Sequence, residues 1–155
     1  MFRILLYTFL ISALPFGEAR LGIPFAVFNK VHYGVAFAVG LMGNLLVYPL
    51  FMWLIDRFNK KLWSHSFYKK SFIRFSRMAK KGMGDKLEKY GFWGLMVFVM
   101  VPLPGTGAYT GTIAAALFGI ERKKAFLAIA LGVFISCALM VALSYAGRYG
   151  VSLLG

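Results

Sequence analysis

The sequence predicts an all-α integral membrane protein with two inverted repeats, each a re-entrant helical hairpin followed by a transmembrane helix. Three observations predict this fold class. Hydrophobic residues make up 60% of the 155 residues and charged residues only 15%, a balance typical of chains embedded in lipid. The apolar residues form four long stretches separated by charged residues. Proline and glycine break the first and third stretches, whereas the second and fourth are long enough to cross a bilayer.

Residues 1–30 are expected to form the first re-entrant hairpin. Its two apolar arms, 4–14 and 21–28, are separated by the break PFGEAR, and Pro24 interrupts the second arm again. A crossing helix needs about 20 apolar residues, so each arm reaches about halfway and the chain returns to the side it entered. The opening run resembles a short signal peptide, but no small-x-small cleavage site follows it, so we expect it to be retained.

Residues 31–56 are expected to form an uninterrupted transmembrane helix. Tyr33 and Trp53 lie near its two ends, where interfacial aromatic residues are common. Asn44 lies near the middle of the stretch. An asparagine at that depth can line a pathway or hydrogen-bond a neighbouring helix, and the sequence leaves both roles open.

Residues 57–89 are predicted to be a basic cytoplasmic segment. Residues 56–89 include eleven Lys or Arg against three Asp or Glu, and an excess of positive charge marks the cytoplasmic side of a membrane protein. Apolar residues recur in it at helical spacing, which predicts an amphipathic helix lying on the membrane surface. These residues are Tyr68, Phe72, Phe75 and Ala79.

Residues 90–120 are expected to form the second re-entrant hairpin. The break VPLPGTGAYTG, at 101–111, has two prolines and three glycines and separates the arms 92–101 and 108–118. Basic residues precede the first arm and follow the second. Both ends of this hairpin are therefore expected on the cytoplasmic side.

Residues 121–147 are expected to form the second transmembrane helix, followed by a short tail at 148–155. The whole chain is then a single membrane domain. Because one transmembrane helix separates the two hairpins, they are predicted to enter from opposite faces, as in the inverted repeats of transporters. The basic segment would be cytoplasmic, and both termini would be outside.

Glu18 and Arg20 are the first candidates for a functional site, since they are the charged side chains predicted to lie within a hairpin. Ionisable residues at membrane depth are costly and usually functional. Arg20 can attract an anion such as phosphate or carboxylate, helped by backbone N–H groups at helix N-termini. Glu18 can carry a coupling proton, because burial favours its neutral form and a nearby arginine its charged form. The alternative is a structural ion pair that braces the two hairpins.

The remaining candidates lie mainly at the two breaks. Hydroxyl groups at the second break can donate hydrogen bonds to a polar head group, or they can serve only to satisfy the broken backbone. The amides of the GTG sequence at 105–107 can contact an anion. The further residues predicted to bind substrate or to couple transport are Pro24, Asn44, Pro102, Pro104, Gly105, Thr106, Gly107, Tyr109 and Thr110.

Several functional classes are not expected. The net charge of +13 is concentrated between apolar stretches, which favours membrane topology and anionic lipid over nucleic acid. The sequence lacks a serine–histidine–acid arrangement and a Gly-rich phosphate loop with lysine, so neither an enzyme nor a cofactor is expected. Cys137 is the single cysteine and is expected to be a buried packing residue.

The expected partners are membrane lipids and a second copy of the chain. Two full spans provide little wall around a pathway, so we expect a homodimer; the alternative is that two hairpins and two spans of one chain pack into a minimal bundle alone. Small residues repeat every fourth position after the second break and allow close helix contact, either with the first hairpin or with another chain. They are Gly107, Gly111, Ala115 and Gly119; Asn44 is the other candidate contact.

Two segments of the chain resemble the signature regions of a known family. ALPFGEARLGIP in the first hairpin and VPLPGTGAYTG in the second resemble those of the small multidrug export protein family, over essentially the whole chain. The lead-in of Tyr90 and Gly91 before a proline break is more distantly similar to the DedA and VTT superfamily of lipid-handling membrane proteins. DedA proteins typically carry arginines in the corresponding hairpin, where this chain has none. The resemblance implies transport in the plasma membrane of a prokaryote.

Two functions are compatible with these features. The first is an ion-coupled transporter that moves an amphipathic small molecule or an anionic lipid by alternating access around the two hairpins, with a proton as the candidate coupling ion. The second is a non-transporting scaffold that binds anionic lipid or a partner through the basic segment 57–89. Charges and two oppositely directed breaks inside the membrane favour the transporter.

Overall fold

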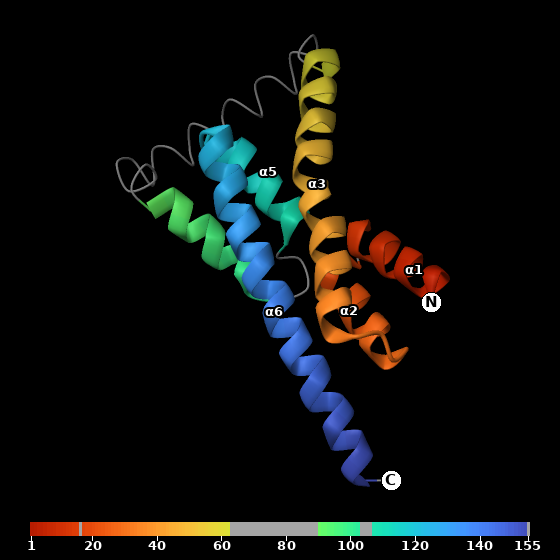
Figure 1. The fold of residues 1–155 in the computed structure, drawn as a ribbon. Helices are drawn as coiled ribbons and strands as arrows, with labels where there is room; N and C mark the ends of the chain where they lie inside the picture. Colours follow the sequence, from red (N-terminus) through yellow and green to blue (C-terminus); the bar gives the residue numbers. More distant parts are fainter. Residues whose placement is uncertain (16, 63–89, 103–106, 155) are drawn as a thin grey trace.

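The computed structural model describes residues 1–15, 17–62, 90–102 and 107–154, and all regular structure within these ranges is helical (Figure 1). The prediction of an all-α chain is confirmed. The predicted amphipathic helix and Pro104, Gly105 and Thr106 lie outside the described residues. The helices are α1 (Phe2–Ala13), α2 (Glu18–Phe28), α3 (Tyr33–Leu62), an unlabelled helix drawn in green (Tyr90–Met100), α5 (Ala108–Phe118) and α6 (Arg122–Leu154).

Two of these helices have the length and composition of membrane spans. The apolar parts of α3 and α6 are Tyr33–Phe58 and Arg122–Arg148, with 26 and 27 residues. At about 1.5 Å per residue, each exceeds the roughly 30 Å of a hydrocarbon core. The prediction of two long apolar helices is confirmed.

Both long helices continue past the boundaries that the sequence predicts. α3 runs on to Leu62, into the basic segment, and α6 runs on to Leu154, where a short tail is expected. The charges that end an apolar stretch do not end a helix, since lysine and arginine are good helix formers. No proline follows Pro49 in α3, and none lies in α6, so the backbone of both helices continues beyond the apolar part.

The helices α3 and α6 run in opposite directions and pack together along their length (Figure 1). Three aromatic pairs and one ion pair join them, with ring centroids 5.3–5.5 Å apart. The Tyr48 hydroxyl also donates a hydrogen bond of 3.0 Å to the Arg122 carbonyl. In order along α3, the pairs are Tyr33–Tyr145, Phe37–Phe134, Tyr48–Phe126 and Asp56–Arg122.

Two pairs of short helices pack against this long pair. The first is α1 with α2, and the second is the helix Tyr90–Met100 with α5. At 11 or 12 residues, α1, α2 and α5 are each only about 17–18 Å long, too short to cross a bilayer. The predicted interruption at Pro24 is wrong, because Pro24 lies inside α2. A proline there removes only one backbone hydrogen bond, that to the carbonyl of Arg20.

Glycines allow the short helices to approach their neighbours closely. A Cβ atom on Gly22 would collide with the Ser12 side chain, and one on Gly43 would lie 2.9 Å from the Phe9 carbonyl oxygen. The second pair repeats this arrangement, since Cβ atoms on Gly111 and Gly132 would crowd Val99. Small residues of this kind are typical of helix contacts in membranes.

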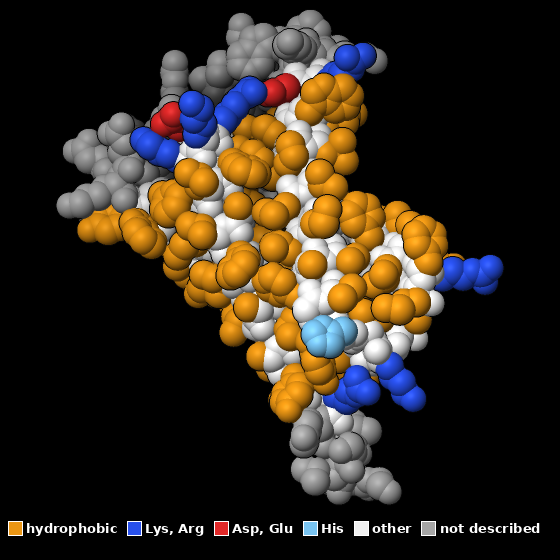
Figure 2. Space-filling model, in the orientation of Figure 1, with side chains coloured by type: hydrophobic (Ala, Val, Ile, Leu, Met, Phe, Trp, Pro, Cys, Tyr) orange, Lys and Arg blue, Asp and Glu red, His pale blue; other side chains and the backbone are white. Residues whose placement is uncertain are grey.

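The face of the described residues shown in Figure 2 carries a broad apolar belt, with the charged side chains at its edges. Large apolar side chains are exposed on every described helix, including Leu50 at 67% and Leu143 at 59%. Such an area of exposed apolar surface is far larger than a soluble monomer displays. It fits a molecule surrounded by lipid.

The glycine contacts lead to a prediction about stability. In Gly132→Ala the new Cβ would lie 2.7 Å from the Met96 carbonyl oxygen, so we expect a loss of about 1–3 kcal/mol in the free energy of unfolding. Gly147→Ala is the matched control on the same helix, because no atom lies within 4 Å of its Cβ position. Denaturation of both variants in detergent would measure the difference, and equal stability would contradict the packing described.

Candidate functional site

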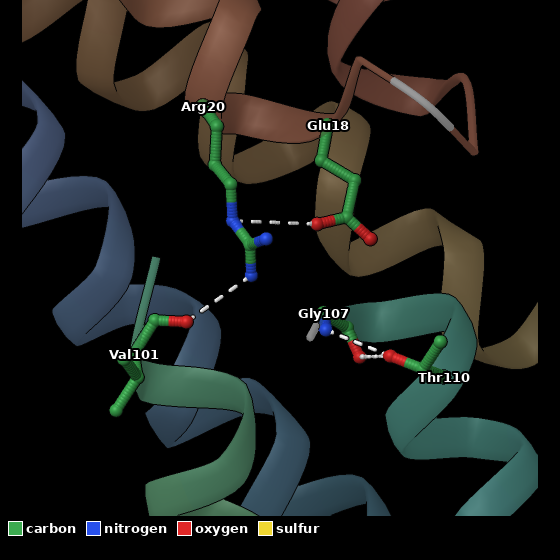
Figure 3. Close-up of polar contacts among 5 residues, drawn as sticks. All are labelled: Glu18, Arg20, Val101, Gly107 and Thr110. Atoms are coloured by element: carbon green, nitrogen blue, oxygen red, sulfur yellow. Dashed lines mark hydrogen bonds and ion pairs between the residues drawn. The ribbon is translucent and has the colours of Figure 1, made fainter. Parts of the chain in front are cut away.

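The candidate site lies where the breaks of the two short helix pairs meet (Figure 3). We call it the break site. Each pair supplies groups that bind backbone atoms of the other pair. The break site consists of Ala13, Glu18, Arg20, Val101, Gly107, Ala108 and Tyr109.

The Glu18 carboxylate binds the N-terminus of α5. Glu18 is the first residue of α2 and is only 7% exposed. Its carboxylate lies against Gly107 at the start of α5, beside the backbone N–H groups of Ala108 and Tyr109, which have no partner within their own helix. The positive end of the helix dipole also favours a carboxylate at this position. A side chain of the first helix pair therefore caps a helix of the second.

Gly107 leaves the space that this carboxylate occupies. A Cβ atom at Gly107 would overlap the Glu18 carboxylate, so any larger residue would displace the carboxylate or move α5. Glu18 itself has a φ of 48°, in the left-handed region that non-glycine residues seldom adopt. The approach of the two breaks therefore depends on a glycine on one side and on a strained residue on the other.

Arg20 contacts both Glu18 and the end of the helix Tyr90–Met100. Its Nε lies 3.7 Å from Oε2 of Glu18, and its side chain is 15% exposed. Its terminal nitrogen donates a hydrogen bond of 3.3 Å to the carbonyl of Val101. Val101 directly follows the helix Tyr90–Met100, where carbonyl groups have no partner within the helix. The guanidinium thus binds the second pair while neutralising Glu18 (Figure 3).

Tyr109 makes the reverse connection. Its hydroxyl donates a hydrogen bond of 2.5 Å to the carbonyl of Ala13, the last residue of α1. Its ring packs edge-on against Phe51 of α3, with centroids 5.0 Å apart. A side chain of the second pair therefore caps a helix of the first, and α3 holds that side chain in place.

Two threonines near the break site bond their own helix. Thr110 accepts a hydrogen bond of 2.9 Å from the Gly107 amide and donates one of 3.3 Å to the Gly107 carbonyl. Thr112 donates one of 2.6 Å to the Ala108 carbonyl. In this conformation the hydroxyls satisfy backbone groups around the break, one of the two roles that the sequence left open.

The other predicted residues are spread more widely. Pro24 and Pro102 are half-buried, and Pro102 follows the Val101 carbonyl that Arg20 binds. Asn44 is 4% exposed, and its side-chain oxygen has no hydrogen-bond partner among the described residues. Gly111 and Ala115 of the small-residue stripe are buried against the chain itself, whereas Gly119 ends α5 with a φ of 68°.

Sequence reasoning missed the backbone acceptors of the break site. The carbonyls of Ala13 and Val101 have no residue-type signal, although their places at helix ends imply that they need partners. It also treated Cys137 only as a packing residue. Cys137 is buried on α6 and lies within electrostatic range of Glu18.

The two long apolar helices and the apolar belt identify the chain as an integral membrane protein. A comparison with family models matches residues 18–139 to the family described as "Putative small multi-drug export protein". The match covers most of the chain and includes Glu18, Arg20 and the second break, so the chain belongs to this family. Searches of curated proteins and of solved structures gave no match.

Loss of the Tyr109 hydroxyl tests the connection between the breaks. Tyr109→Phe would leave the Ala13 carbonyl without this donor, and we expect a loss of about 1–3 kcal/mol in the free energy of unfolding. Tyr7→Phe is the matched control, since Tyr7 is 54% exposed on α1. Denaturant titration in detergent would compare them, and an unchanged stability for Tyr109→Phe would show that this bond does not hold the pairs together.

Proposed function

We propose that the chain is an ion-coupled transporter in the plasma membrane of a prokaryote. Its cargo would be an amphipathic small molecule or an anionic lipid, moved by alternating access around two re-entrant hairpins. One observation carries the proposal: the ion pair of the buried Glu18 and the partly buried Arg20 lies at the junction of two broken helices. Ionisable groups at membrane depth are rare, and in transporters they mark the path of substrate or protons.

The re-entrant course of the two helix pairs is supported by their lengths and by their ends. In the first pair, α1 and α2 are each too short to cross, and the exposed Arg3 and Lys30 lie at the two outer ends of the pair. In the second pair, α5 is followed by the exposed cluster Glu121 to Lys124. The charged outer ends therefore belong at membrane surfaces, while the breaks meet within the apolar belt.

Corresponding features of the two halves support an inverted repeat. Gly22 and Gly111, and likewise Gly43 and Gly132, make matching close contacts and are separated by the same interval in the sequence. The same interval separates Lys30 and Gly119, which end α2 and α5 with φ values of 62° and 68°. After them, the amides of Val31 and Ile120 bond the carbonyls of Ala26 and Ala115, both at 3.0 Å.

In the proposed cycle, each half provides one gate and the break site lies between the gates. Arg20 would hold the anionic or polar head group, and Glu18 would carry the coupling proton. The scaffold alternative depends on the basic segment, most of which lies outside the described residues. A scaffold has no need of an ion pair between two helix breaks, so the break site favours transport. A homodimer would complete the wall of the pathway.

Accessibility of single cysteines tests the re-entrant topology. Arg3→Cys and Lys30→Cys are expected to react with a membrane-impermeant thiol reagent in intact cells, and Lys123→Cys only after permeabilisation. All three positions are exposed, whereas the native Cys137 is buried, so the parent chain is the unlabelled control. Labelling of Arg3→Cys and Lys30→Cys from opposite sides would disprove the first hairpin.

Transport into proteoliposomes tests the proposed function. Under an imposed pH gradient, the wild type should move fluorescent anionic lipids or amphipathic dyes, and Glu18→Gln and Arg20→Ala should lose this movement because coupling and head-group binding fail. Glu121→Gln and Arg3→Ala are the matched controls, since both side chains are exposed. Normal transport by both break-site variants, with folding and insertion verified, would exclude the coupled carrier and favour the scaffold.

A further inference from the structure

We infer that the break site is a binding site for one anionic oxygen group, which Glu18 occupies until that group replaces it. The ligand would be a phosphate or sulfate-like head group, seated on the α5 amides and Arg20. Replacement requires Glu18 to take up a proton, so one proton enters the site with each monovalent anion. The inference rests on the proposed function and specifies how cargo and proton would be coupled.

The donors of the site converge on a single carboxylate. The Glu18 carboxylate lies against Gly107, beside the amides of Ala108 and Tyr109 at the start of α5, and Arg20 lies on it as well, with Nε 3.7 Å from Oε2. Two backbone amides at a helix N-terminus together with a guanidinium are the donor set that binds oxyanions. A carboxylate from another helix already occupies that set. Because the present occupant is an oxyanion, the ligand that replaces it should be an oxyanion as well.

The Glu18 carboxylate packs closely against Gly107, and the Glu18 backbone adopts an unfavourable conformation. Gly107 has no Cβ, and a Cβ there would overlap the carboxylate, so the site leaves room for an acceptor against the backbone. Glu18 reaches it from a residue with a φ of 48°, a conformation that costs free energy in a non-glycine residue. Withdrawal of the side chain together with relaxation of this backbone would relieve that strain, which favours replacement of Glu18.

Charge determines how the exchange takes place. Among the described residues, the titratable or charged side chains that interact with Glu18 are Arg20 on α2, Tyr109 on α5 and Cys137 on α6. Arg20 alone is a cation, so two anions at these donors would leave one negative charge uncompensated in an apolar environment. A protonated Glu18 and a bound monovalent anion keep the net charge of the site unchanged. The exchange is therefore electroneutral, with the proton on the Glu18 carboxyl oxygen.

Proton uptake during binding tests the inference on the full chain in detergent. The probes are dioctanoyl phosphatidylglycerol, a monovalent anion that does not titrate near neutral pH, methyl sulfate as a free monovalent anion, and dioctanoylglycerol as the uncharged control. Binding of phosphatidylglycerol to the wild type should take up about one proton, and its affinity should rise about tenfold per unit fall in pH where Glu18 is ionised. Dioctanoylglycerol, which has no anionic group, should cause no proton uptake.

The variant Glu18→Gln should bind phosphatidylglycerol with no proton uptake and no dependence on pH, while Glu121→Gln should match the wild type. Binding of methyl sulfate with the same proton uptake would assign the site to free anions, and binding of phosphatidylglycerol alone would assign it to lipid head groups. If Glu18→Gln does not fold, the pH dependence of the wild type decides. Anion binding without proton uptake would overturn the inference. Gradient-driven transport of a cargo by a wild type that binds neither anion would overturn it and leave the proposed function standing.

Discussion

Backbone groups freed at a helix break need hydrogen-bond partners, and this need is most severe where no water reaches them. The structure meets it by placing the two breaks against each other. Glu18 binds the first amides of α5, Arg20 binds the Val101 carbonyl, and Tyr109 binds the Ala13 carbonyl. The position of one half of the molecule therefore depends on the other half.

This mutual capping explains why the charges are found where they are. A buried ion pair seldom adds much stability, because desolvation offsets the attraction between its members. Here each member of the pair has a second partner on the opposite break. Removal of either charge therefore takes one partner from the other charge and one from the opposite helix end. The same contacts that hold the halves together would have to change in any cycle that opens them, so stability and transport would be controlled by the same atoms.

The sequence predicts much of this architecture because the helices are indicated by properties of whole segments and not of single residues. Apolar length and the positions of proline and glycine identify the two long helices and the short arms, and α5 has the predicted bounds of 108–118. The pair Glu18 and Arg20 stands out because charge inside an apolar stretch is rare. Helix ends are predicted less well. Pro24 lies inside α2, and α3 and α6 continue past their charged boundaries. Charged residues end an apolar stretch of sequence, but they do not interrupt the hydrogen bonds of a helix.

The partners in the break site could not be predicted, because most of them are backbone atoms. Any residue supplies the Val101 and Ala13 carbonyls, so only the fold brings them to Arg20 and Tyr109. Gly107 is visible in the sequence as a helix breaker, whereas its role of leaving space for a carboxylate depends on α2. The amide oxygen of Asn44 has no partner among the described residues, and we have no physical account of it.

The most direct measurement of the central claim is amide hydrogen exchange at Ala108 and Tyr109, resolved by nuclear magnetic resonance in detergent. If the Glu18 carboxylate caps α5, both amides are protected in the wild type and exchange much faster in Glu18→Gln, while amides in the middle of α6 keep their rates. Equal exchange at Ala108 and Tyr109 in the two proteins would contradict the capping of one half by the other.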